Sequence, residues 1–207
     1  MNKLETLEKR WKELLAMAGT RTFTKEELEA YNNELDTLAD MIEKESAKEY
    51  KGFIKELGQA GIRIDSIWDL VNTNERYPEA IEPLLKYLPL VKDSRTKEGF
   101  IRALAVKEAK GRSIPLLLKE FERASKQKLD LRWVIGNAIN AGFTKEHVES
   151  LYPIVLDEEN RWARDGFIRA ISKVRTEETR SVLMQVIDAP DESTRKEVLR
   201  ALKKFKT

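Results

Sequence analysis

The sequence contains no cysteine and only one histidine, His147, in 207 residues. Without cysteine the chain can form neither a disulfide nor a thiolate metal site, and it has no thiol nucleophile. One histidine cannot build a multi-histidine metal centre. The sequence also shows no glycine-rich phosphate loop and no serine–histidine pair in a catalytic motif. We therefore expect a protein that is not an enzyme and that holds no metal and no cofactor.

Long apolar segments, glycine and proline are also scarce. No apolar run approaches the roughly 20 residues that span a bilayer, and the N-terminus lacks the apolar core of a signal peptide, so we expect a cytoplasmic protein without membrane contact. Nine glycines and six prolines, with 36% charged and 41% hydrophobic residues, are typical of an ordered all-α protein. A net charge of +2 gives no general attraction to nucleic acid.

An octet of similar residues recurs along the chain. It is clearest at 97–104 (KEGFIRAL) and 164–171 (RDGFIRAI), and it returns more loosely at 195–202, 132–139 and 50–57. The four C-terminal copies begin 35, 32 and 31 residues apart. Between the copies, apolar residues follow the spacing i, i+3, i+4, i+7, as in Ile114, Leu117, Leu118 and Phe121. Two helical patterns in each period predict stacked αα-hairpins.

These repeats resemble the HEAT family, especially its short bacterial form. The family carries an acidic or amide residue before the second helix and a basic residue early within it. Here Asp93 precedes Lys97, Asn160 precedes Arg164, and Asp191 precedes Arg195, each by four residues. The copy at 132–139 departs from this pattern, because Lys128 stands in the acidic place. The resemblance covers 77–206 well and 47–60 more loosely. It implies a right-handed αα-superhelix, a HEAT-like solenoid that serves as a scaffold or binding surface.

Residues 1–46 lie outside the repeats and predict a helical hairpin. An apolar stripe runs along 2–18, and Thr24 and Glu27 form a capping box before the second helix. We interpret the hairpin as a cap on the repeats. Its outer face could instead pair with a second copy, so we expect a monomer or a weak dimer through this hairpin. The chain is then one solenoid domain, with the hairpin at 1–46, an irregular repeat at 47–76 and four HEAT-like repeats at 77–206.

Each position of the octet predicts a role on a helical wheel. Phe100, Ile101 and Leu104 fall within a narrow arc and predict core. The glycines at the third position predict close helix packing; they are Gly52, Gly99 and Gly166. The first position is basic, and we expect its charged head to reach the preceding acidic residue. The family resemblance implies that this column, Lys97, Arg132, Arg164 and Arg195, forms a ladder between repeats.

The sixth position of the octet points away from the core and is mostly basic. This outer column consists of Lys55, Arg102, Asn137, Arg169 and Arg200. The second helices line the concave groove of HEAT-like solenoids, so the resemblance places the column there, with Trp133 and Trp162 close by. Arginine and tryptophan are favoured at binding hot spots, so our first hypothesis is a protein or peptide partner in the groove. Nucleic acid is the alternative, because the same residues suit phosphates and stacked bases. An ordinary solvated face is the third interpretation.

A remote third function is a DNA glycosylase. HEAT-like glycosylases that remove alkylated purines carry the motif Trp-Asp-x-x-Asp, to which Trp68 and Asp69 are similar. Asn72, however, stands where the catalytic aspartate of that family belongs. An amide cannot stabilise a developing sugar cation as a carboxylate does. We therefore interpret Trp68 and Val71 as core residues and Asp69 as a surface residue.

Overall fold

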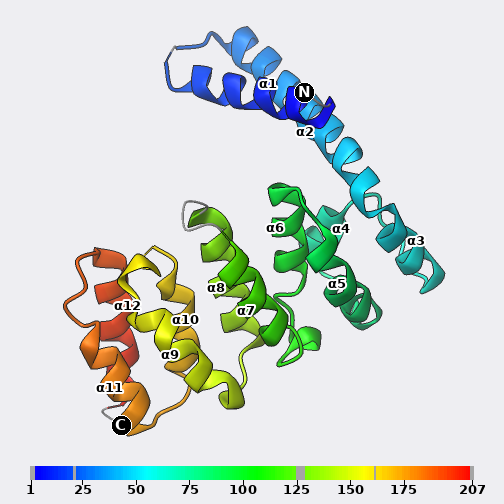
Figure 1. The fold of residues 1–207 in the computed structure, drawn as a ribbon. Helices are drawn as coiled ribbons and strands as arrows, with labels where there is room; N and C mark the ends of the chain where they lie inside the picture. Colours follow the sequence, from blue (N-terminus) through cyan, green and yellow to red (C-terminus); the bar gives the residue numbers. More distant parts are fainter. Residues whose placement is uncertain (1–2, 21, 125–128, 161, 206–207) are drawn as a thin grey trace. The chain divides into compact units, whose positions relative to one another are not determined.

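The computed structural model describes residues 3–20, 22–124, 129–160 and 162–205, and within these ranges every regular element is a helix (Figure 1). The predicted all-α class is therefore confirmed. Contacts between Cα atoms divide the chain into two compact units, Met1–Leu70 and Val71–Thr207. The division falls inside 47–76, the segment assigned to an irregular repeat, where the sequence predicts no boundary.

The first unit begins with an antiparallel hairpin of two helices. Leu7 and Leu14 of the first helix share a small core with Leu38 and Ile42 of the second. Arg10 donates a hydrogen bond of 2.7 Å to Glu34 across the pair. The predicted capping box of the second helix is present, with both of its hydrogen bonds formed. The helices of this unit are α1 (Lys3–Ala18), α2 (Lys25–Ser46), α3 (Lys51–Gln59) and α4 (Ile67–Asn72), whose last two residues lie beyond the boundary.

Helix α3 follows a 3-10 turn at Ala47–Tyr50 and buries one face only. Phe53 and Leu57 form that face and are fully buried. Gly52 lies on the exposed side of α3, so the predicted close packing at this glycine is wrong. The buried hydroxyl of Tyr50 accepts a hydrogen bond from the backbone N–H of Ile67, which joins the start of α3 to α4.

The second unit consists of four successive helix pairs (Figure 1). The first helices of the pairs are α5 (Ile81–Tyr87), α7 (Ile114–Arg123), α9 (Val148–Leu156) and α11 (Glu177–Gln185). The second helices are α6 (Ser94–Ala103), α8 (Leu129–Gly142), α10 (Arg164–Ile171) and α12 (Glu192–Lys203). A 3-10 turn at Pro78–Ala80 precedes α5, and further 3-10 turns lie between the helices at Leu88–Leu90, Lys107–Ala109, Lys145–His147 and Glu158–Asn160.

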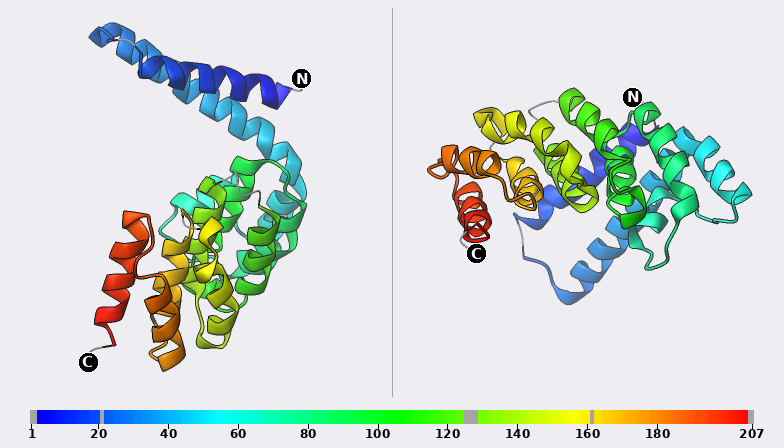
Figure 2. Two further views of the ribbon diagram at one scale, coloured as in Figure 1. Left: turned by 60° about the vertical axis from the view of Figure 1, so that its left-hand side comes forward. Right: turned by 90° about the horizontal axis from the view of Figure 1, so that it is seen from below.

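The second helices pack against one another in chain order. Helix α6 contacts α8, α8 contacts α10, and α10 contacts α12, and both views in Figure 2 show this sequence of neighbours. The predicted core positions of the octet are fully buried at this row, as Phe100, Ile101 and Leu104 show. The same holds for Phe167, Ile168 and Ile171 in α10. The wheel prediction of the core is therefore correct for α6 and α10.

Two glycines allow the closest approach in the row, where α8 crosses α10. A Cβ atom added to Gly166 would lie 2.3 Å from the carbonyl carbon of Gly136 and 2.8 Å from the backbone nitrogen of Asn137. Such distances leave no room for any side chain. The predicted packing role of Gly166 is therefore confirmed, and Gly136 on the facing helix shares it.

Candidate partner-binding surface

The middle of the outer column forms a polar ladder across three second helices. The guanidinium of Arg169 on α10 donates 2.6 Å to the side-chain oxygen of Asn137 on α8 and 3.2 Å to the carboxylate of Glu197 on α12. Glu197 is mostly buried, with a side-chain exposure of 14%. The side chains of Asn137 and Arg169 therefore form hydrogen bonds between neighbouring helices, and these bonds stabilise the stacking of the pairs.

The outer members of the column are exposed and only partly neutralised. Arg102 forms an ion pair of 2.7 Å with Glu98 one turn earlier, as its place beside the column predicts. Arg200 lies 3.5 Å from Glu197 and keeps 70% of its side chain exposed. Lys55 is exposed on α3, but it belongs to the first unit. Glutamates beside the column thus partly neutralise its arginines, and the second unit has no continuous basic ridge there.

Two tryptophans of the second unit are exposed. Trp133 on α8 is 44% exposed, and Trp162, in the turn just before α10, is 56% exposed. Large aromatic side chains are mostly buried in folded proteins, because each carries 150–250 Å² of mainly apolar surface. Both residues occupy positions that the repeat pattern does not require to be aromatic.

The packing of α8 against α10 places the first half of α8, with Trp133, beside the turn before α10, with Trp162. Arg132, next to Trp133, donates a hydrogen bond to Asn160, two residues before Trp162. A Cβ atom on Gly136 would lie 3.0 Å from the carbonyl oxygen of Ala163, directly after Trp162. Contacts between α8 and the segment before α10 therefore lie on both sides of Trp162 in the sequence, at Asn160 and at Ala163.

The first octet position forms the predicted ladder, but with different partners. Lys97 donates 2.5 Å to the buried carboxylate of Glu120 on α7, which follows in the chain. Arg132 bonds to Asn160 of the next pair and to the carbonyl oxygens of Phe121 and Ala124. The expectation that the cation reaches the preceding acidic residue is wrong for Lys97. Lys128, which marked the departure from the family pattern, lies outside the described residues.

The preceding acidic residues cap helices instead. Asp93 accepts a hydrogen bond of 2.7 Å from the backbone N–H of Thr96 at the start of α6. Asp191 accepts one of 2.8 Å from the N–H of Thr194 at the start of α12. A carboxylate at this position satisfies an amide that has no partner within the helix, so the local bond competes successfully with the cation. Arg195 consequently donates to the carbonyl oxygens of Ala189 and Pro190.

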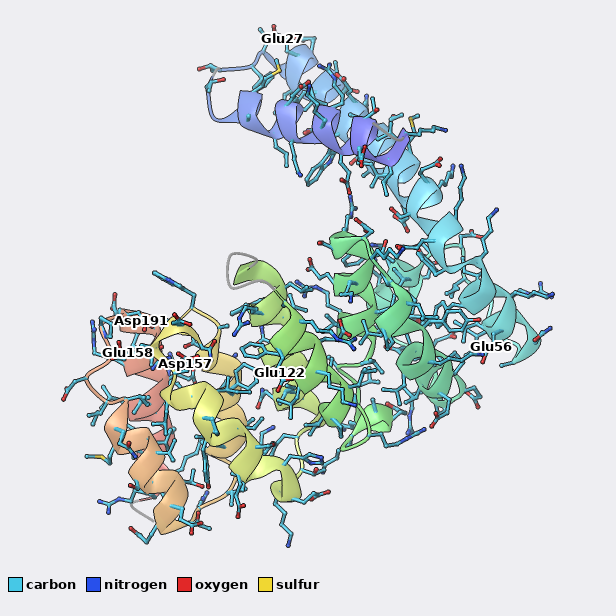
Figure 3. All side chains as sticks on the ribbon, viewed as in Figure 1. Glu27, Glu56, Glu122, Asp157, Glu158 and Asp191 are labelled. Carbon is cyan, nitrogen blue, oxygen red and sulfur yellow. The ribbon has the colours of Figure 1, made fainter. Side chains whose placement is uncertain are left out.

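Arg164 is the most deeply buried charge of the ladder, at 1% exposure. Burial lowers the pKa of its guanidinium, and the nearby carboxylates of Asp191, Glu158 and Asp157 oppose that shift. Figure 3 shows these three acidic side chains close together at one end of the second unit. They surround a buried cation, so their arrangement is explained by charge compensation. Among the described residues, no group of three potential ligands could hold a metal ion.

The stretch that resembles a glycosylase motif is a helix cap. The carboxylate of Asp69 accepts hydrogen bonds from the backbone N–H groups of Asp65 and Ser66, at 2.8 and 3.0 Å. The hydroxyl of Ser66 accepts one from the N–H of Trp68. These two side chains cap the start of α4 as in a capping box, except that the Ser66 hydroxyl accepts from the second helical amide and not from the third. Asp69 is exposed as predicted, whereas the core residues of α4 are Ile67 and Leu70.

Trp68 and Val71 are only partly buried, so the interpretation of this pair as core is wrong in degree.

No helix among the described residues is long and apolar enough to cross a membrane. Comparison with known proteins gives no relative, because no family model, no curated protein and no solved structure matches this chain. The arrangement of the side chains is therefore the basis for any functional conclusion.

Two glutamates that take part in these contacts were not predicted from the sequence. Glu120 and Glu197 supply the carboxylates that receive Lys97 and Arg169. Neither glutamate belongs to the basic column or to the outer column. Each lies on a neighbouring helix that comes close to its cation only when the pairs stack. The helical wheel gives little signal for Glu120, which is buried although it lies about 60° beyond Leu117, outside the apolar stripe of α7.

Proposed function

We propose that this protein is a HEAT-like α-solenoid that acts as a non-catalytic scaffold or adaptor. The repeated octet, the chain-order packing of the second helices and the ladders between pairs support this architecture. Neighbour-to-neighbour packing of similar units is typical of solenoids, which bind partners on an extended surface.

The partner is a protein or peptide held on the face of the second helices, which in a HEAT-like solenoid lines the groove. The observation that carries this proposal is the pair of exposed tryptophans, Trp133 on α8 and Trp162 in the turn just before α10. Tryptophan supplies a large rigid contact area at low entropic cost and is enriched at hot spots. Arg102 and Arg200 contribute polar contacts at the rim, since their charged groups remain accessible.

The charge pattern of this face favours a protein over nucleic acid. Arg169 is bonded to Asn137 and Glu197, and Arg102 is paired with Glu98. A phosphate backbone gains affinity mainly from cations whose charge is not already compensated. The outer column offers few of these, so a partner with mixed charge fits it better.

Affinity purification from the native host, followed by mass spectrometry, tests the proposal. The wild type is compared with a variant that carries Trp133→Ala and Trp162→Ala, and with Leu90→Ala as a control for loss of an exposed apolar side chain, since Leu90 is 64% exposed. We expect a protein that the wild type and the control retain and the double variant loses. Identical sets of captured proteins from all three would refute the proposal.

A further inference from the structure

The last helix pair exposes octet positions that are buried in the preceding pairs. At the fifth position, Ile101 and Ile168 are fully buried, whereas Leu199 on α12 is 50% exposed. At the eighth position, Leu104 and Ile171 are fully buried, whereas Leu202 is partly exposed. Helix α6 packs on α8 of the next pair, and α10 packs on α12. Helix α12 thus exposes apolar positions that α6 and α10 bury.

The other side of α12 is already occupied by α10. Glu197 receives Arg169 there, and Lys204 donates 3.0 Å to the hydroxyl of Ser172. At about 100° per residue, Leu199 and Leu202 lie roughly 200° and 140° around the helix from Glu197. The exposed leucines therefore face away from α10, at the end of the row of second helices.

Charged residues flank the two leucines with opposite signs at the two ends. Glu192 and Lys203 fall within about 40° of Leu199 on the wheel. Arg195 bends back to the carbonyl oxygen of Ala189, so its charge is withdrawn from this stripe. We call the surface made by Glu192, Leu199, Leu202 and Lys203 the terminal face.

We infer that the terminal face joins two copies of this chain about a twofold axis, with the two α12 helices antiparallel. A twofold contact needs a self-complementary surface, and an acidic end opposite a basic end provides one. With Leu199 on the axis, Lys203 lies about 6 Å along the helix and the partner's Glu192 about 10.5 Å, at about 1.5 Å per residue. The remaining offset of about 4.5 Å is within reach of a lysine–glutamate pair.

The dimer is weak and depends on concentration. Its apolar centre consists of two side chains from each copy, and Lys196 already pairs with Glu192 at 2.6 Å within one chain. The added ion pairs are exposed at the rim, so salt screens them. The contact is separate from the surface of Trp133 and Trp162, and it uses the C-terminal helix, not the N-terminal hairpin.

Sedimentation equilibrium of the full chain over a hundredfold concentration range tests the inference. We expect a reversible monomer–dimer equilibrium and an increase of about tenfold or more in the dissociation constant for Leu199→Glu, since a buried unpaired charge replaces an apolar contact. Leu90→Glu makes the same change at another exposed leucine and should leave the constant unchanged. Circular dichroism establishes that both variants are folded.

Charge reversal tests the antiparallel geometry. Glu192→Lys and Lys203→Glu should each weaken self-association, because each places like charges at both contacts. A mixture of the two variants should dimerise more tightly than either alone, since both contacts then pair lysine with glutamate. A strict monomer over the whole range, an equal effect of Leu199→Glu and Leu90→Glu, or a mixture no tighter than its components would overturn the inference.

Discussion

Replacing Gly166 by alanine should destabilise the second unit, because no space exists for a methyl group where α8 crosses α10. The new Cβ atom would lie 2.3 Å from the carbonyl carbon of Gly136 and 2.4 Å from its oxygen. Non-bonded carbon atoms normally lie about 3.5–4.0 Å apart. These neighbours are backbone atoms and cannot rotate away, so the two helices must separate by about 1 Å.

The expected cost follows from two opposing effects. Forcing a methyl group into a filled interior costs about 1–3 kcal/mol, and rigid backbone neighbours put this site at the upper end. Alanine in a helix interior returns about 0.5–1 kcal/mol relative to glycine. The net loss is about 2 kcal/mol, which lowers the melting temperature by roughly 8 °C at about 4 °C per kcal/mol.

Two other glycines provide graded controls for Gly166→Ala. The melting temperature of each variant is measured by thermal unfolding monitored by circular dichroism. A Cβ on Gly136 meets the carbonyl oxygen of Ala163 at 3.0 Å and the ring of Phe167 at 3.1 Å, so Gly136→Ala should cost less than Gly166→Ala. A Cβ on Gly58 in α3 meets nothing within 4 Å, and Gly58→Ala should be neutral or stabilising. If Gly166→Ala were as stable as the wild type, α8 and α10 could not pack as closely at Gly166 and Gly136 as the structure shows.

Four further predictions concern buried polar contacts and the alternative functions. Glu120→Ala leaves Lys97 without its carboxylate partner and should lower the free energy of unfolding, measured with urea, by about 3 kcal/mol. The double variant Lys97→Met, Glu120→Leu should regain most of that free energy, because it leaves no unpaired buried charge. Burial raises the pKa of Tyr77 to about 12, from 10.0. The neutral phenol therefore stabilises the fold fully below pH 10.0, and this contribution to the free energy of unfolding is lost as the pH rises through about 12. Tyr77→Phe should not show this loss of stability at alkaline pH. Asp69→Ala should lose about 1 kcal/mol as a broken helix cap, and neither it nor the wild type should release bases from alkylated duplex DNA. A labelled oligonucleotide should not bind even at low salt, and steeply salt-dependent binding would favour the nucleic-acid alternative.

The octet predicted the core of the second unit because burial on a helix follows directly from its angular period. Phe100, Ile101 and Leu104 needed no knowledge of neighbouring pairs to be placed correctly. The same reasoning failed for the partner of Lys97. Glu120 lies 23 residues away, and only the stacking of α6 on the following pair brings the two side chains together.

The outer column shows the same limit for the candidate site. The wheel placed Asn137 and Arg169 on the face away from the core, where both are partly exposed. It could not show that they bond to each other across α8 and α10, because that contact depends on the register between helices. The exposure of Trp133 and Trp162 likewise depends on how tightly neighbouring turns cover them, which the helical period does not encode.

The most direct test of the proposed function is the affinity of the captured partner for single tryptophan variants, measured by titration calorimetry. Both side chains are about half exposed, so Trp133→Ala and Trp162→Ala should leave the fold and its melting temperature nearly unchanged. If they anchor the partner, each should cost 2 kcal/mol or more of binding free energy, or about thirtyfold in Kd. Unchanged affinity for both variants would contradict the account.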